Sequence, residues 1–301
     1  MAFGFDVAAL PAYTDQLSLD LISKVVLKTD LLDYIDLRSG FTSGTVAINL
    51  VDAALPVSAL SCGFTPDGQV TYTQVNVTID SLQSKTTMCV EDLRSVYQSA
   101  FMNAGTGNDF IPFENVISES YSDKLRKYNE GFLINGSAGG AMTGLKGQIT
   151  AANGANLQGG AIAAWTAANA FEQALDLYDA IDESVKDRDD LIMVVSPDAY
   201  RALVRALVAQ NLYHFNSVES NDILILPGTN VTVVKSSGLV GSDNKFAGPG
   251  KMILAATGLT DELDNFRFFY DEAADVMKFR AAWRLGVGVG EVNVFATNDM
   301  A

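Results

Sequence analysis

The stretch NVISESYSDKLRKYNEGF, residues 115–132, contains the clearest helical pattern of the chain. Its large apolar residues recur at steps of four, four, three and four: Ile117, Tyr121, Leu125, Tyr128 and Phe132. Residues at this spacing share one face of an α-helix, and the charged residues between them, Glu130 included, fall on other faces. We therefore predict a long amphipathic helix whose apolar face lies in the core of the same chain.

Two segments rich in β-branched residues precede this helix. Residues 46–50 alternate in polarity, and residues 69–80 read QVTYTQVNVTID, so both are predicted to be strands of one long hairpin. In the second strand the apolar positions shift from even numbers, as at Tyr72, to odd numbers from Val75 onward. A bulge or a change of packing partner would explain that shift.

The chain after the long helix alternates between helical and strand patterns. A glycine-rich stretch suggests a boundary near Gly160, and Ser196 followed by Pro197 is a typical helix start. The predicted elements are helices at 14–29, 163–183 and after Ser196, strands at 191–195, 223–226, 231–234 and 252–256, and a hairpin of 266–270 with 276–294. The fold class is therefore α+β.

Four carboxylates line one face of the helix predicted at 163–183: Glu172, Asp176, Asp179 and Glu183. Like charges at this spacing destabilise a helix slightly, so the face is either solvated, or paired with basic residues, or bound to a divalent cation. Arg201 and Arg205, one turn apart on the next helix, are the expected basic partners, from the same or a neighbouring subunit.

The composition of the chain restricts the classes of function that it can have. The chain has 301 residues, 48% of them hydrophobic, and its 20 Lys plus Arg against 36 Asp plus Glu give a net charge of −16. Such a chain folds, but it repels phosphates, so sequence-specific DNA binding is not expected. The longest uncharged stretch, residues 147–171, is too polar to cross a membrane, and the N-terminus shows no signal-peptide pattern.

No catalytic, cofactor or metal motif is found. His214 is the only histidine and no GxSxG elbow accompanies it, while the GVGVGE run at 286–291 sits in a β pattern with no helix after it. Cys62 and Cys89 are either two free thiols or a pair at the base of the hairpin. We therefore expect no enzyme, no cofactor and no bound metal.

The order of these parts resembles the major capsid proteins of tailed double-stranded DNA bacteriophages, which have the Hong Kong 97-type fold. The resemblance is carried by VNVTIDSLQSKTTMCVEDLRSVY (75–97), by the long helix ending in GFLING, by DLIMVVSPDAYRALVRAL (190–207) and by the closing stretch 258–296. It implies an N-terminal arm (1–39), an extended β-hairpin loop (40–84), a peripheral domain (85–159) with the spine helix at 115–132, an axial domain (160–257) and return strands of the peripheral domain (258–301).

The resemblance implies a structural subunit that forms hexamers and pentamers of an icosahedral shell around double-stranded DNA. The location would be the virion capsid, assembled in the host cytoplasm, with portal, separate scaffold and decoration proteins as further partners. The expected contact residues are Thr71, Tyr72, Val75 and Val77 on the loop, Arg201 and Arg205, and Tyr213 and His214 near a symmetry axis.

One departure from the family concerns the extended loop. Residues 40–84 contain no Lys or Arg, and Lys85 lies only at their edge, so isopeptide cross-linking from this loop is not expected. Two alternatives remain open at this stage: an encapsulin-type nanocompartment shell, which shares the fold but encloses cargo enzymes, and a β-rich phage tail or adhesin binding module.

Overall fold

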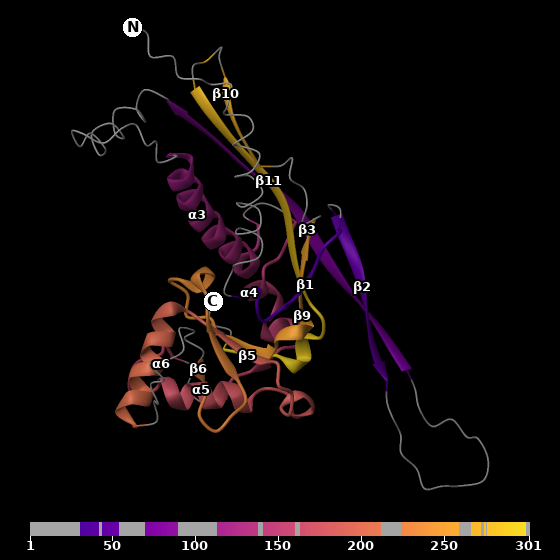
Figure 1. Cartoon of the computed structure of the whole chain (residues 1–301). Coiled ribbons are helices and arrows are strands. Elements are labelled where there is room, and N and C mark those ends of the chain that lie inside the picture. The colour runs from indigo at the N-terminus through magenta and orange to yellow at the C-terminus, as the bar shows by residue number, and fades with distance from the viewer. Residues whose placement is uncertain are drawn as a thin grey trace.

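The described part of the chain forms two six-stranded sheets and four α-helices (Figure 1). The computed structural model describes residues 31–41, 44–53, 70–89, 113–137, 141–159, 163–211, 224–258, 266–271, 274 and 276–298. The helix expected at 14–29 lies outside them. The mixture of helix and sheet confirms the predicted α+β class.

The elements have the following bounds. The first sheet runs β1 (Asp36–Arg38), β9 (Ile253–Thr257), β11 (Val276–Val289), β3 (Val70–Cys89) and β2 (Gly44–Ala53), with β10 (Phe266–Asp271) beside β11. The second runs β4 (Asn156–Leu157), β12 (Ala296–Thr297), β8 (Phe246–Pro249), β5 (Leu191–Val195), β7 (Thr232–Lys235) and β6 (Leu224–Ile225). The α-helices are α3 (Phe113–Asn135), α4 (Leu145–Gln148), α5 (Ala170–Asp179) and α6 (Pro197–Ala209). The 3-10 helices are η2 (Ala151–Asn153), η3 (Glu183–Val185), η4 (Ser237–Leu239), η5 (Gly250–Met252) and η7 (Val292–Val294).

β3 is the longest strand, and it changes partner along its length. It pairs antiparallel with β2 from Val70 to Ile79 and with β11 from Thr78 to Cys89. Both registers are unbroken, so the predicted bulge is wrong. The shift between Tyr72 and Val75 lies within the stretch paired with β2, so a change of packing partner at that point stays a prediction. Val75, Val77 and Ile79 are buried against Leu254 and Ala256 of β9, which accounts for the odd-numbered apolar positions.

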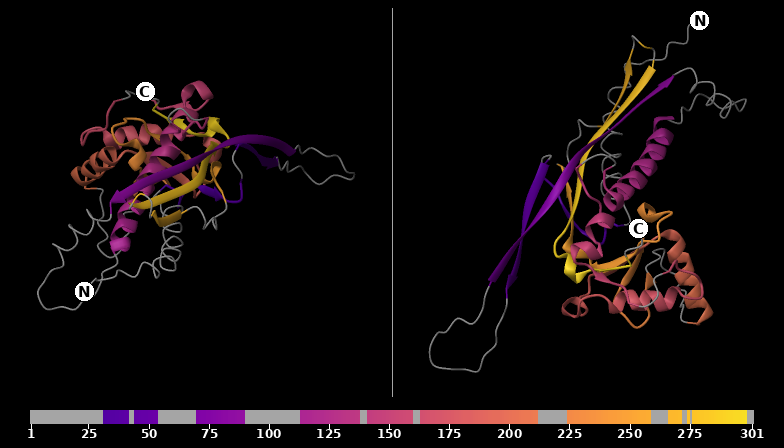
Figure 2. Two further views of the ribbon diagram at one scale, coloured as in Figure 1. Left: turned by 90° about the horizontal axis from the view of Figure 1, so that it is seen from above. Right: turned by 180° about the vertical axis from the view of Figure 1, so that it is seen from behind.

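α3 packs against one face of β3 and β11 (Figure 2). Leu125 and Phe132 are buried as predicted, and Phe279 and Trp283 of β11 are buried among the same core residues. Two details of the predicted apolar face are wrong: Tyr128 is 55% exposed and Glu130 is only 4% exposed. Glu130 is buried because its carboxylate accepts hydrogen bonds from Ser237, from the backbone N at 3.1 Å and from Oγ at 2.6 Å.

The second sheet forms a separate unit with α5 and α6. β5 and the α6 start are confirmed, since Ser196 Oγ accepts a hydrogen bond from Ala199 N at 3.2 Å and Pro197 occupies the first turn. α5 is shorter than the predicted 163–183, because a turn closed by Asn169 precedes it and Asp182 caps η3 after it.

Two strands of this region differ from the prediction. The strand expected at 252–256 is β9, which joins the first sheet through β1 and β11. β8, with the sequence FAGP, was not predicted, because a four-residue segment with Gly and Pro carries no period-two pattern.

The glycines of the GVGVGE run have a packing role. They lie in β11, and a Cβ on Gly286 would stand 2.5 Å from the Thr78 carbonyl oxygen, while one on Gly288 would stand 2.6 Å from Val77 Cγ2. Side chains at these positions would therefore separate β11 from β3. The dinucleotide-loop interpretation is excluded by this strand geometry, as the sequence already indicated.

We predict that Gly286→Ala destabilises the subunit by about 1–3 kcal/mol or more, because the added methyl overlaps backbone that has no free space. Thermal unfolding followed by circular dichroism measures this change. Gly159→Ala is the matched control, since nothing lies within 4 Å of the Cβ it would add. Equal melting temperatures for the two variants would contradict the packing role.

Candidate assembly surfaces

The hairpin of β2 and the first half of β3 projects from the molecule on the side away from α6 (Figures 1 and 2). Over residues 70–77, β2 is the only strand paired with β3 in the described part of the chain. An isolated two-stranded ribbon is at best marginally stable in water. The ribbon is therefore a surface that a further protein layer would stabilise.

Two of the four loop residues predicted to contact a neighbouring subunit are buried inside their own chain. Val75 is 7% exposed and Val77 is 0% exposed, because both pack against β9 of the same chain. Thr71 and Tyr72 lie further out on β3, opposite Asp52 and Val51 of β2, and their contact role stays a prediction.

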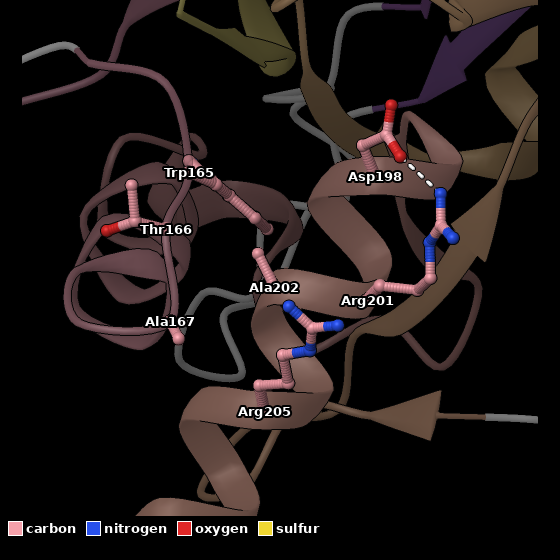
Figure 3. A pocket seen from close by; sticks show the side chains of 7 residues that line it. All are labelled: Trp165, Thr166, Ala167, Asp198, Arg201, Ala202 and Arg205. Atoms are coloured by element: carbon pink, nitrogen blue, oxygen red, sulfur yellow. Dashed lines mark hydrogen bonds and ion pairs between the residues drawn. The ribbon is translucent and has the colours of Figure 1, made fainter.

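A second candidate surface is an open pocket of about 480 Å³ between α6 and the segment before α5 (Figure 3). Trp165, Thr166 and Ala167 line one side, and Asp198, Arg201, Ala202 and Arg205 line the other. Arg201 forms an ion pair with Asp198 of its own helix and a hydrogen bond to Pro197 O at 3.4 Å. Arg205 is exposed and has no ion pair with any described residue.

The predicted pairing of these arginines with the acidic face of α5 is wrong within one chain. Glu172, Asp179 and Glu183 are exposed, and Glu183 lies 3.5 Å from Lys186 instead. Among the described residues no cluster of acidic, histidine or cysteine side chains could hold a metal ion. Glu183 lies in η3, beyond the end of α5, whereas Glu172 and Asp179 of α5 form no ion pair with any described residue.

The remaining predicted residues lie outside the described ranges or stand alone. Tyr213, His214 and Cys62 fall outside, so the axis contacts and the thiol pair stay predictions. Cys89 is exposed with a free thiol. In the described ranges no helix has the length and apolarity to span a membrane.

Behind the pocket lies a buried cation that sequence reasoning missed. Lys245 is 1% exposed, its Nζ lies 5.2 Å from the centre of the Trp165 ring, and it donates a hydrogen bond to Asp243 O at 2.6 Å. Burial lowers the pKa of Lys245 to about 8, and the nearby Asp243 carboxylate opposes this only in part. A lone lysine between Asn244 and Phe246 carries no signal of burial in the sequence.

We predict that Lys245→Met stabilises the subunit at pH 7 by about 1–3 kcal/mol, because the buried charge is costly and methionine keeps the contact with Trp165. Between pH 8 and 10.5 the unfolded lysine holds its proton while the folded one has lost it, so wild-type stability rises with pH. The gap in melting temperature between variant and wild type should therefore shrink from pH 7 to pH 10. A gap of constant size would contradict the buried-charge explanation.

Comparison with known proteins places this geometry in a structural class. By sequence, the chain matches no protein-family model and no curated protein. By structure, it resembles the capsid of the native GTA particle (TM-score 0.57, 14% identity, 90% of each chain covered). It also resembles a satellite phage P4 procapsid structure that includes the size determination (Sid) protein (TM-score 0.58, 10% identity, 99% and 91% covered).

A third similar structure is a virus-like particle from Pyrococcus furiosus (TM-score 0.54, 12% identity, 95% and 98% covered). These matches extend over at least nine tenths of this chain and include both the long sheet and the unit around β5. The chain therefore has the Hong Kong 97-type fold of tailed-phage capsid proteins, as the resemblance in its sequence implied.

Proposed function

We propose that the chain is the major capsid protein of a tailed phage, a structural subunit that assembles into hexamers and pentamers of an icosahedral shell around double-stranded DNA. The observation that carries this proposal is the projecting ribbon of β2 and β3 on a capsid-type fold. Outside the part packed on β9, the ribbon is a two-stranded pairing in the described chain, and such a pairing is stabilised when it lies over a neighbour.

Ring formation requires two different surfaces of each subunit to meet, because a ring contact is heterologous. The unit around β5 offers such a pair: the exposed carboxylates of α5 and the two arginines of α6. Since Arg205 finds no carboxylate in the described part of its own chain, a carboxylate of the adjacent subunit is its proposed partner. Contacts of this obligate kind bury roughly 2,000 Å² or more.

An encapsulin-type shell is the second candidate, and the similarity to the virus-like particle from Pyrococcus furiosus favours it as an alternative. It differs in its contents, protein cargo instead of a genome. The β-rich tail or adhesin module has no such support among the three similar structures described above, which are of a capsid, a procapsid and a virus-like particle.

A capsid role also determines the expected location and partners of the chain. The chain acts without catalysis, in the virion capsid, after assembly in the host cytoplasm. Portal, scaffold and decoration proteins would be its partners besides its own copies, and DNA would be enclosed without sequence recognition. The net charge of −16 suits a wall that does not adhere to packaged DNA.

Negative-stain electron microscopy of the purified chain, with sedimentation at low and high salt, tests the proposal. Closed shells, or capsomer rings that close when a scaffold protein is added, are expected. Nucleic acid in shells isolated from infected cells would select the phage capsid, and protein cargo would select the nanocompartment. A monomer under every condition, scaffold included, would overturn both.

We predict that Arg205→Glu weakens ring formation and raises the subunit concentration needed for assembly about two- to tenfold, because it places a like charge against the neighbour's carboxylates. Arg201→Glu should act in the same direction. Sedimentation velocity of assembly reactions measures the change, with Lys251→Glu, an exposed lysine outside α6, as control. If Arg205→Glu assembles normally, α6 is not part of the interface between subunits.

A further inference from the structure

The long sheet has one covered face and one open face. On the covered face, Phe279 and Trp283 of β11 pack with α3 and the core. On the open face, Ser81, Gln83, Lys85 and Thr87 of β3 are exposed, and the residues opposite them on β11 include Arg280 and Arg284. This open face contains no large apolar side chain among these positions, so an apolar partner would gain little from it.

A row of basic residues crosses this open face. Lys85 of β3 stands directly opposite Arg280 of β11, and Arg267 of β10 stands at the register position opposite Arg280 on the other side. Directly opposed residues of antiparallel strands share a face, with Cβ atoms roughly 5 Å apart. Like charges in that relation destabilise a sheet, so the opposed pair Lys85 and Arg280 is costly unless an anion neutralises it.

The described part of the chain supplies no such anion. Neither Lys85 nor Arg280 forms an ion pair or side-chain hydrogen bond there, although both are exposed. Asp271 of β10 is on the same face, where it pairs with Lys278, two positions before Arg280. Among the described residues, Lys85 and Arg280 are thus an unneutralised basic pair, in a chain whose acidic residues outnumber its basic ones, 36 to 20.

We propose that the row Lys85–Arg280 is a docking site for carboxylates of a second copy of this chain. This inference rests on the proposed function, which surrounds each subunit with copies at fixed positions. A second copy is the occupant favoured by charge, because it carries a large excess of carboxylates.

The proposal predicts opposite effects of one substitution on the free subunit and on the shell. Lys85→Thr removes the like-charge opposition, so the melting temperature of the free subunit should rise by about 1–3 °C. The same change removes an ion pair between copies, so the concentration needed for shell formation should rise about two- to fivefold at low salt. The assembly difference should vanish near 1 M salt, where the screening length is about 3 Å.

Gln83→Thr is the matched control, because it places the same side chain on the same exposed face of β3 without removing a charge. Its shell formation should stay near wild type, and any rise in its melting temperature measures strand propensity alone. A purely structural role for Lys85 would lower both stability and assembly, so the opposite signs are diagnostic. If wild-type subunits close into shells and Lys85→Thr closes equally well at low salt, this inference fails while the proposed function stands. If wild-type subunits never assemble, the proposed function itself fails.

Zero-length carbodiimide cross-linking of assembled shells identifies the occupant. Shells built from mixed light and heavy nitrogen subunits should yield a Lys85 peptide joined to an Asp or Glu peptide of the other isotope. A Lys85 peptide joined only to a decoration or scaffold protein would overturn the assignment to a second copy. Protection of Lys85 from acylation by DNA alone would overturn it in favour of phosphate.

Discussion

The structure depends on the way β3 divides its hydrogen bonds. From Thr78 onward the strand lies inside a sheet, with β11 beside it and α3 against one face. Before Thr78 it has β2 alone as a paired strand in the described chain. One half of the strand is therefore anchored inside the sheet, while the other half, beyond the contact of Val75 and Val77 with β9, continues with β2 alone beside it in the described chain. This division presents a rigid base and an incompletely covered projection to neighbouring molecules.

The base of the projection is rigid because polar contacts join segments that are distant in sequence. Asn129 of α3 accepts a hydrogen bond from Trp283 Nε1 at 2.9 Å, and Glu130 holds the first turn of η4 through Ser237. Gln148 accepts a hydrogen bond from Val289 N at 3.1 Å and donates one to Val287 O at 3.0 Å. Since buried polar groups without partners are costly, these contacts fix α3, the unit around β5 and β11 relative to one another.

The sequence predicted the elements whose patterns are local. The period of α3, the alternation of β11 and the Ser196 cap all follow from neighbouring residues, and each is present. The strand or side chain that a segment packs against is not determined by neighbouring residues. The sequence therefore could not show that β9 pairs with β1 and β11, or that Val75 and Val77 are buried in the core of their own chain. Burial of Glu130 and Lys245 was missed for the same reason, because their partners, Ser237 and Trp165, lie far away in sequence. The sequence could not predict that Lys85 lies opposite Arg280, because this pairing depends on the register of β3 and β11.

We expect other copies of the chain to complete the ribbon of β2 and β3. Hydrogen exchange followed by mass spectrometry, on dissociated subunits and on closed shells, measures this directly. The account predicts that amides of residues 44–53 and 70–77 exchange about a hundredfold or more slowly in shells than in free subunits, while those of residues 191–195 in β5 change little. Equal protection of the ribbon in both states would show that the projection is stable alone, and would contradict the account.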